Sequence, residues 1–151
     1  KGKSVMMGYY KKPEETAAAF TEDGYLKTGD LGRFNSDETH LYVTGRIKNL
    51  IILSNGENIS PEELEKKFAD EKVIKEIVVC AENNRIIAEV FPDEEFAKAA
   101  GIENIEEYLQ EKVRLANKGE KSYREIAALR LRTTPFPKTT TGKIKRNHIK
   151  Y

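Results

Sequence analysis

The spacing of hydrophobic residues changes along the chain at a stretch between residues 45 and 65. Before this stretch apolar residues come in short, scattered pieces, and after it they come in longer periodic runs. The continuous apolar run 50–53 predicts a short strand that is buried on both sides. Ser54-Asn55-Gly56 follows and predicts a turn, because Asn and Gly tolerate positive φ. We place a domain boundary at Ile47 or Lys48, which divides the chain into residues 1–47 and 48–151.

A helix is predicted directly after this turn. Ser60 has the capping-box spacing to Glu63, and Pro61 occupies the first helical position, where its missing N–H costs nothing. Leu64 and Phe68 lie four residues apart, so they share one face of the helix, which we expect to be buried.

The first 45 residues predict only short elements. Pro13 begins a short helix over 13–20. Strand-like pieces follow at 25–27, 31–34 and 41–44. These pieces contain few large aliphatic residues and cannot close a core, so we expect them to be the edge of a larger domain that lies outside this chain.

The residues after the helix predict a self-sufficient α+β fold. Two apolar runs, 75–81 and 85–91, flank Asn83-Asn84 and predict a β-hairpin. Two helices follow, 93–100 ending at Gly101 and 105–118 ending at Gly119.

The C-terminal third adds one more strand to this prediction. Ser122 caps a further helical turn, and residues 128–132 form a half-buried strand with leucines inward and arginines outward. Residues 133–144 are loop-like, and a helix is expected from Lys145. The sequence therefore predicts a small domain in which a hairpin and a third strand form one sheet packed by helices.

Charge adds little to this picture except at the C-terminus. Charged residues make up 34% of the 151, and the net charge is +1, which gives no overall bias toward nucleic acid. The local excess of positive charge lies in the last fourteen residues, at Lys138, Lys143, Lys145, Arg146 and Lys150. No aromatic residues interleave with these lysines, so a nucleic-acid partner is not expected.

Cysteine, histidine and hydropathy exclude several classes of site. The single Cys80 sits in an apolar run, which fits a buried strand residue in a reducing compartment, and we expect a cytoplasmic protein. His40 and His148 lie far apart without clustered cysteines, so no metal site is expected in this chain. No apolar run reaches the roughly 20 residues that a transmembrane helix needs.

Three small groups of residues could carry chemistry, and each has a structural alternative. Thr28-Gly29-Asp30 puts a carboxylate in a turn, where it could accept hydrogen bonds from a ribose diol or serve only the turn. Arg46 could reach a phosphate or be an ordinary surface arginine. The run 139–143 resembles half of a phosphate-binding P-loop, but Pro137 and Ile144 stand where that motif needs Gly and Ser or Thr. Lys143 is nevertheless well placed to bring a positive charge to an anion.

The order and spacing of these groups resemble those of the C-terminal part of the adenylate-forming superfamily, which includes acyl-CoA synthetases, luciferases and adenylation domains of peptide synthetases. Residues 25–30 resemble its Y-x-[KR]-T-G-D motif, and residues 45–65 resemble G-R-x-[DK]…G-x-x-[IL]-x-P-x-E-[IL]-E. Residues 137–143 resemble P-[KR]-[TN]-x-[ST]-G-K. The resemblance covers essentially the whole chain.

This resemblance implies an activity and residue roles. Such enzymes use ATP to convert a carboxylic acid to an acyl-adenylate and then pass the acyl group to coenzyme A. Asp30 would bind the ribose hydroxyls, Arg46 would assist at the ribose or phosphate, and Lys143 would be the catalytic lysine of adenylation. Lys48 would be the hinge about which the small C-terminal domain rotates between the half-reactions.

The rotation would bring another part of the chain to the thiol acceptor. The loop Ser54-Asn55-Gly56-Glu57-Asn58 would lie beside the pantetheine channel. The length of this loop and the lysine at the hinge favour the long-chain fatty acyl-CoA synthetases, so a fatty acid is the expected substrate. The implied cofactors are ATP, coenzyme A and Mg²⁺, the metal being bound mainly by an N-terminal domain outside this chain.

The resemblance leaves other interpretations open. The full-length protein could activate an aryl, amino or short-chain acid and load a carrier protein, or the chain could be a non-catalytic binding module of the same fold. Lys143 is also a candidate for regulatory acylation. In this family the phosphate-binding loop, the acyl pocket and the adenine pocket belong to a large N-terminal domain, and nothing in this chain matches them, so we expect the chain alone to be inactive. Its own N-terminal domain would be its partner, and peripheral membrane contact by the full-length protein stays open.

Overall fold

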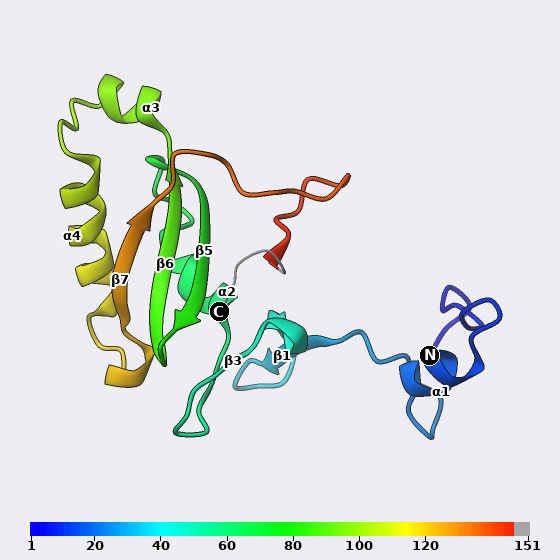
Figure 1. The fold of residues 1–151 in the computed structure, drawn as a ribbon. Coiled ribbons are helices and arrows are strands. Elements are labelled where there is room, and N and C mark those ends of the chain that lie inside the picture. Colours follow the sequence, from blue (N-terminus) through cyan, green and yellow to red (C-terminus); the bar gives the residue numbers. More distant parts are fainter. Residues whose placement is uncertain (147–151) are drawn as a thin grey trace. The chain divides into compact units, whose positions relative to one another are not determined.

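The structure is a computed structural model that describes residues 1–146 (Figure 1). The contacts of the chain divide it into two units, Lys1–Lys48 and Asn49 onward. Each unit is described by itself below. The basic residue Lys150, His148 and most of the helix expected from Lys145 lie outside the described residues.

The first unit contains one helix and one two-stranded ribbon. Its elements are α1 (Pro13–Ala19), β1 (Asp30–Phe34) and β2 (Leu41–Arg46), followed by the 3-10 turn η1 (Ile47–Asn49). β1 and β2 pair antiparallel, with an irregularity between Leu31 and Gly32. The expected strand at 25–27 is wrong. Only an isolated bridge joins Leu26 to Phe20, because residues 21–24 between them form a turn closed by Thr21.

The first unit buries almost nothing. Among residues 1–48, all of which the structure describes, Gly45 alone is buried. Leu41 and Val43 are more than half exposed on β2, and Phe34 is equally open on β1. The ribbon therefore presents apolar side chains and has no core of its own.

The second unit begins with a small ribbon and a helix. Its first elements are β3 (Ile51–Ile52), β4 (Asn58–Ile59), α2 (Pro61–Glu65) and the 3-10 turn η2 (Lys66–Phe68). Leu64 and Phe68 are buried, as predicted. Burial of the strand on both sides is wrong, because Ile51 is 5% exposed but Ile52 is 72% exposed. Successive residues of a strand face opposite ways, and only one face of β3 meets the core.

The predicted capping box at α2 is also wrong. The Ser60 side chain makes no capping hydrogen bond to the helix backbone. Its hydroxyl donates instead to Glu62 Oε2, at 3.0 Å, while Glu63 pairs with Arg124. Pro61 does begin the helix, as its place at the first helical position predicted.

A three-stranded sheet is the centre of the second unit, in the order β5-β6-β7. Its strands are β5 (Ile74–Glu82), β6 (Arg85–Pro92) and β7 (Ile126–Leu131). β5 and β6 form the predicted antiparallel hairpin, whose turn residues Asn83 and Asn84 have φ of 48° and 62°. β7 runs parallel to β6, so the sheet is mixed.

Two helices and a 3-10 turn connect β6 to β7, namely α3 (Glu94–Ala99), α4 (Ile105–Asn117) and η3 (Ser122–Arg124). Asp93 caps α3 by accepting the Phe96 N–H at 2.9 Å, and Asn104 caps α4 in the same manner. Gly101 and Gly119 follow the helices with positive φ, as the sequence predicted. The expected cap at Ser122 is wrong, because its side chain makes no capping bond and Lys121 holds the cap position.

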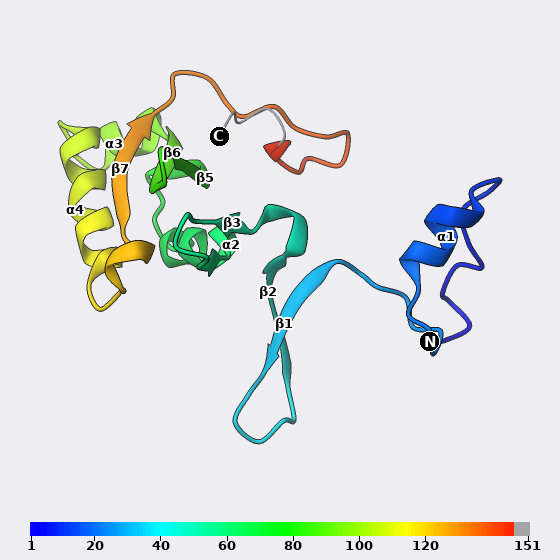
Figure 2. The ribbon, with the colours of Figure 1, turned by 60° about the horizontal axis from the view of Figure 1, so that its bottom comes forward.

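The two faces of the sheet are covered by different parts of the chain (Figure 2). Helices α2 and α4 pack on one face, over Val79, Ile86 and Ile126. The other face carries an apolar group that the C-terminal segment covers, consisting of Val78, Cys80, Ile87 and Phe136, with Ile144 against it. On β7, Leu129 packs on the core, but Leu131 is 37% exposed because the strand ends there, so only one of the two leucines on this face is packed.

No helix among residues 1–146 is both long enough and apolar enough to cross a membrane.

Candidate functional site

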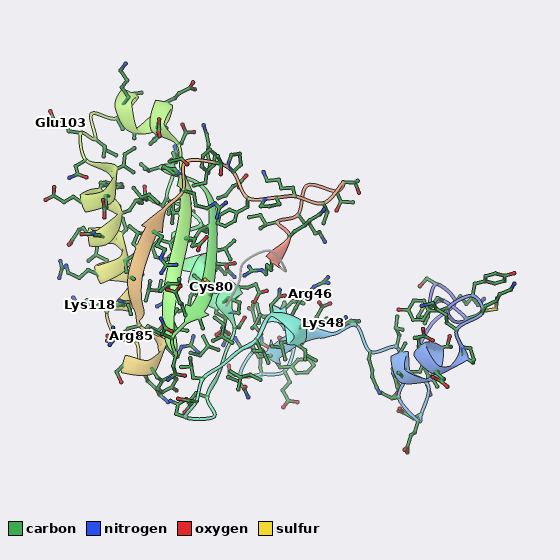
Figure 3. All side chains as sticks on the ribbon, in the orientation of Figure 1. Arg46, Lys48, Cys80, Arg85, Glu103 and Lys118 are labelled. Carbon is green, nitrogen blue, oxygen red and sulfur yellow. The ribbon has the colours of Figure 1, made fainter. Side chains whose placement is uncertain are left out.

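In the first unit the structure brings together two of the predicted site residues. Asp30 begins β1 and Arg46 ends β2, and the two are direct partners across the ribbon. Arg46 is labelled in Figure 3, and its Nε lies 3.2 Å from Asp30 Oδ1. The turn before Asp30 is held because the Ile47 N–H donates to the Gly29 carbonyl at 2.9 Å, with Gly29 at a φ of 76°. A carboxylate and a guanidinium are thus side by side, and the first can accept hydrogen bonds from hydroxyl groups while the second can donate them to an anion.

Lys48 lies at the end of the first unit. Its side chain is exposed within η1, and the division between the two units falls directly after it. On the other side of the division, the Asn49 side-chain amide donates to Glu62 Oε1 of α2. The hinge role of Lys48 stays a prediction.

The loop of residues 54–58 connects β3 to β4 as a closed turn. The Leu53 N–H donates to the Glu57 carbonyl at 3.0 Å, and the Gly56 N–H donates to the Leu53 carbonyl at 2.9 Å. Gly56 has a φ of 82°, which favours glycine at this position, and open space surrounds its missing side chain. The Ser54 N–H donates to Asn84 Oδ1 at 2.7 Å, which fastens the loop to the β5–β6 turn.

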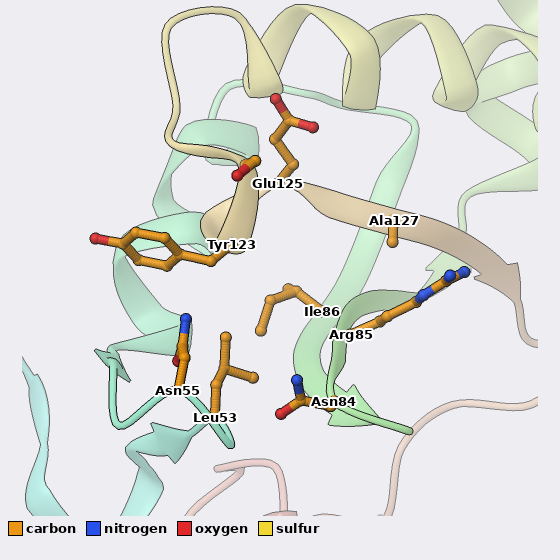
Figure 4. Close-up of a pocket in the computed structure, with 9 residues that line it drawn as sticks. Leu53, Asn55, Asn84, Arg85, Ile86, Tyr123, Glu125 and Ala127 are labelled. Atoms are coloured by element: carbon orange, nitrogen blue, oxygen red, sulfur yellow. The ribbon is translucent and has the colours of Figure 1, made fainter.

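A shallow cavity of about 300 Å³ lies beside this loop (Figure 4). Leu53 and Asn55 line it from the loop side, Asn84 and Arg85 from the hairpin, and Tyr123 from η3. Its lining is mixed polar and apolar, which suits contact with a flexible polar chain better than an enclosed apolar ligand.

Lys143 lies near the tip of a hairpin-like segment, residues 136–145, which we call the arm. The Thr139 N–H donates to the Lys143 carbonyl at 2.8 Å, and the Lys143 N–H donates to the Thr139 hydroxyl at 3.1 Å. Gly142, with a φ of 80°, completes the turn, and the Lys145 N–H closes it on the Pro137 carbonyl. The Lys143 side chain is exposed.

The root of the arm, residues 136–138, is fixed to the sheet. Phe136 is 3% exposed and packs on the apolar group of the second sheet face. Its N–H donates to Glu76 Oε2 at 2.7 Å, and the Lys138 ammonium pairs with Glu76 Oε1. The Arg132 guanidinium stacks 4.3 Å from the centre of the Phe136 ring and pairs with Glu89.

The far end of the arm is held as well. Arg146 pairs with Glu65 of α2 at 2.5 Å, and the second oxygen of Glu65 accepts the Val79 N–H of β5 at 2.7 Å. The arm is therefore tied to the sheet where its first limb begins and to α2 directly after its second limb ends. Its root lies over the start of β5, whereas the loop 54–58 lies against the end of that strand.

The environment shifts the pKa of several groups near the arm. Burial favours the neutral form of Glu76, but the hydrogen bonds from Lys138 and from the Phe136 N–H outweigh it and hold the pKa of Glu76 below its usual value. For Glu65 burial prevails over the contact with Arg146, so its pKa is raised. Burial, together with the nearby charge of Glu89, raises the pKa of Cys80 to about 11, so this thiol is no nucleophile.

Sequence reasoning singled out the exposed candidate site residues but not the residues that hold them in place. It did not single out Glu76, Arg132 or Glu65, whose roles depend on contacts with distant parts of the chain. Phe136 did leave a signal, since it is an aromatic residue between two prolines in a polar segment. Among residues 1–146, no group of three or more His, Cys, Asp or Glu side chains could hold a metal ion.

Comparison with known proteins places this arrangement in a family. Residues 48–150 match the family model of the AMP-binding enzyme C-terminal domain. The chain belongs to the AMP-binding, adenylate-forming enzymes. The matched part contains both the arm with Lys143 and the loop 54–58, so the AMP-binding family accounts for most of the second unit.

Two curated proteins and one solved structure illustrate the relationship. Long-chain-fatty-acid–CoA ligase 4 of Saccharomyces cerevisiae is 36% identical over 74% of this chain, and sulfoacetate–CoA ligase of Cupriavidus necator is 54% identical over 43%. This chain spans only 17% and 12% of the length of these relatives. The o-succinylbenzoate CoA synthetase of Bacillus subtilis, solved with its acyl-adenylate intermediate, superposes with a TM-score of 0.77 at 26% identity, over 100% of this chain and 29% of that one.

Proposed function

We propose that this chain is the C-terminal part of an ATP-dependent acid–CoA ligase, and that the acid is a long-chain fatty acid. The observation that carries the proposal is an exposed lysine, Lys143, near the tip of an arm whose root is fixed to a sheet. Similarity to a long-chain-fatty-acid–CoA ligase over 74% of the chain supports the choice of acid. The relatives act on different acids, so the choice of acid needs its own test.

Lys143 acts in the first half-reaction. A carboxylate oxygen of the acid attacks the α-phosphorus of ATP, and the bond to pyrophosphate breaks. Two anions must approach each other in this step, and the Lys143 ammonium offsets their repulsion as charge builds up in the transition state. Its exposed position near a turn lets it reach an anion bound outside this unit.

Asp30 and Arg46 act on the nucleotide. The Asp30 carboxylate accepts hydrogen bonds from the ribose hydroxyls, and Arg46 lies beside it to contact the ribose or the phosphate. Asp30 is the more enclosed of the two, with its side chain 33% exposed against 61% for Arg46. We assign these two residues to adenylate binding.

The loop 54–58 acts in the second half-reaction. After rotation about Lys48, the loop lies beside the pantetheine arm of coenzyme A, whose thiol attacks the acyl carbonyl and releases AMP. The open space at Gly56 leaves room for that thin chain. We assign the Mg²⁺ that accompanies ATP to residues outside this chain, so none of these roles uses a metal ligand of residues 1–146.

The test uses the full-length protein that contains this chain. We expect long-chain fatty acids to drive ATP–pyrophosphate exchange and acyl-CoA formation more strongly than short-chain, aryl or sulfonated acids. Lys143→Ala should lower the exchange rate on the order of 100-fold or more. The same variant should still convert supplied acyl-adenylate to thioester, because that step does not need Lys143.

Two outcomes would contradict the proposal. If an aryl or sulfonated acid drives the exchange best, the assignment of the substrate is wrong. If Lys143→Ala exchanges pyrophosphate as fast as the unchanged protein, the assignment of the lysine is wrong.

A further inference from the structure

The position of Lys143 depends on the root of its arm. The arm is a short hairpin closed by its own backbone hydrogen bonds, and Lys138 pairs with Ile144 across it. Lys143 is exposed, so no core contact holds its side chain in place. The hairpin reaches on the order of 10 Å from its root, so a rotation of about 5° at the root moves the tip by about 1 Å. A misplacement of that size in a reacting group can lower a rate up to ~100-fold.

Apolar packing alone does not fix the rotation of the root. Phe136 is buried against Val78, Cys80 and Ile87, which sets where the arm lies on the sheet. Burial of apolar surface has little directionality, however, whereas hydrogen bonds and ion pairs depend on angle as well as distance. The directional contacts, which are those of Glu76 at the root and the Arg146–Glu65 pair after the second limb of the arm, therefore decide how the arm is oriented.

Glu76 makes those directional contacts with both of its oxygens. Oε2 accepts the Phe136 N–H at 2.7 Å, and Oε1 pairs with the Lys138 ammonium. Pro137, whose φ is fixed by its ring, separates the two contacts. One carboxylate thus contacts the root on both sides of Pro137, whose backbone is restricted by its ring.

We propose that Glu76 is a positioning residue for adenylation, which holds the root of the arm so that Lys143 meets the substrate anions at the correct place. This inference rests on the proposed function and adds to it a residue of the sheet that touches no substrate. The Glu76 side chain is only 9% exposed, whereas the Lys138 side chain that pairs with it is 45% exposed.

The second sheet face also offers a matched control. Glu82 lies on the same strand and on the same face as Glu76, and it pairs with Arg130. Neither Glu82 nor Arg130 makes a hydrogen bond or ion pair with the arm among the contacts described above. Glu82→Gln therefore removes an ion-paired but more exposed carboxylate (38% against 9%) from the same strand and leaves both Glu76 contacts with the root in place.

The experiment compares both half-reactions in the full-length protein. Glu76→Gln should lower the rate of ATP–pyrophosphate exchange by about tenfold, because a neutral amide loses the ion pair with Lys138. The rate at which Glu76→Gln forms thioester from supplied acyl-adenylate should stay within about twofold of the rate of the unchanged protein. Lys138→Ala should likewise lower the exchange rate and keep the rate of thioester formation, whereas Lys138→Arg should keep the exchange rate. Glu82→Gln should leave the rates of both half-reactions unchanged.

A second measurement tests whether Glu76 holds the root of the arm, and it does not use an activity assay. Trypsin cuts after lysine, and Lys143 and Lys145 lie in the arm. Limited proteolysis followed by mass spectrometry should show faster cleavage at these lysines in Glu76→Gln than in Glu82→Gln. Equal cleavage rates in the two variants would overturn the positioning role.

The outcomes separate this inference from the proposed function. If Lys143→Ala keeps full exchange activity, the proposed function fails, whatever Glu76 does. If Lys143→Ala loses exchange while Glu76→Gln behaves like Glu82→Gln, only the positioning role fails. An equal loss of both half-reactions in Glu76→Gln would mean a general loss of stability and would also overturn that role.

Discussion

Two adjacent asparagines, Asn83 and Asn84, show how one residue type can serve two purposes. Both have positive φ and form the tight turn between β5 and β6. Asn84 also accepts the Ser54 N–H through its side chain, so it joins this turn to the loop 54–58. Sequence alone predicted the turn, because the backbone preference of Asn is local, but the bond to Ser54 spans 30 residues and left no local signal.

This difference gives a prediction at the level of single residues. Asn84→Gly keeps the turn but removes the acceptor, and should lower the free energy of unfolding by about 1 kcal/mol. Asn83→Gly keeps the turn and removes no such bond, so it should change stability by less than about 0.5 kcal/mol. Urea unfolding of the two variants checks this, and equal effects would show that the Asn84–Ser54 bond contributes nothing.

Strand β3 shows why short elements are harder to predict than long ones. Its apolar run fits a strand buried on both sides, yet Ile52 is exposed because the ribbon β3–β4 presents one face to the core. A run of four apolar residues cannot reveal whether a second layer covers it. The helices α3 and α4 were predicted closely, since a glycine marks the end of each and apolar periodicity supports α4 as well.

The neighbouring isoleucines of β3 form a matched pair for a test of this element. Ile51→Ala should lower the free energy of unfolding by about 2 to 4 kcal/mol, because it empties space in the core. Ile52→Ala should cost less than about 0.5 kcal/mol, since its side chain already meets solvent. Thermal or urea unfolding distinguishes the two. A large cost for Ile52→Ala would instead mean that another surface covers β3.

At the scale of the whole chain, the sequence pointed to the candidate site residues but not to the residues that hold them in place. Asp30 and Arg46 were found through short motifs, and the ribbon does pair them. Lys143 was found through its motif, and it is exposed. Glu76 and Arg132 were not singled out, because their contacts join segments that are far apart in the sequence. Glu76 and Phe136, for example, are 60 residues apart.

Buried carboxylates make the stability of the second unit depend on pH. For Glu71, burial favours the neutral form, but hydrogen bonds from Lys112 and from the Tyr108 hydroxyl outweigh it and lower its pKa. A carboxyl whose pKa is lower in the folded state stabilises the fold above its unfolded pKa of about 4.5. That contribution is lost as the pH falls through the lowered folded value.

Glu71→Gln tests this dependence. The variant should be less stable than the unchanged chain at neutral pH, and the difference should shrink as the pH falls below about 4.5. Urea midpoints measured across this range check the prediction. Glu103→Gln, which changes an exposed carboxylate, serves as the control and should follow the unchanged chain. A difference that stays constant with pH would show that the Glu71 contacts do not depend on its charge.

The hydrogen bond from the Val79 N–H to Glu65 also affects whether strands of other molecules can pair with this sheet. β5 is an edge strand, and the outward N–H groups of an edge strand can pair with a strand of another molecule. The Glu65 carboxylate already occupies the N–H of Val79 in the middle of that edge. A foreign strand would have to displace a buried acceptor before it could add to the sheet, so the same contact protects the protein against edge-to-edge aggregation.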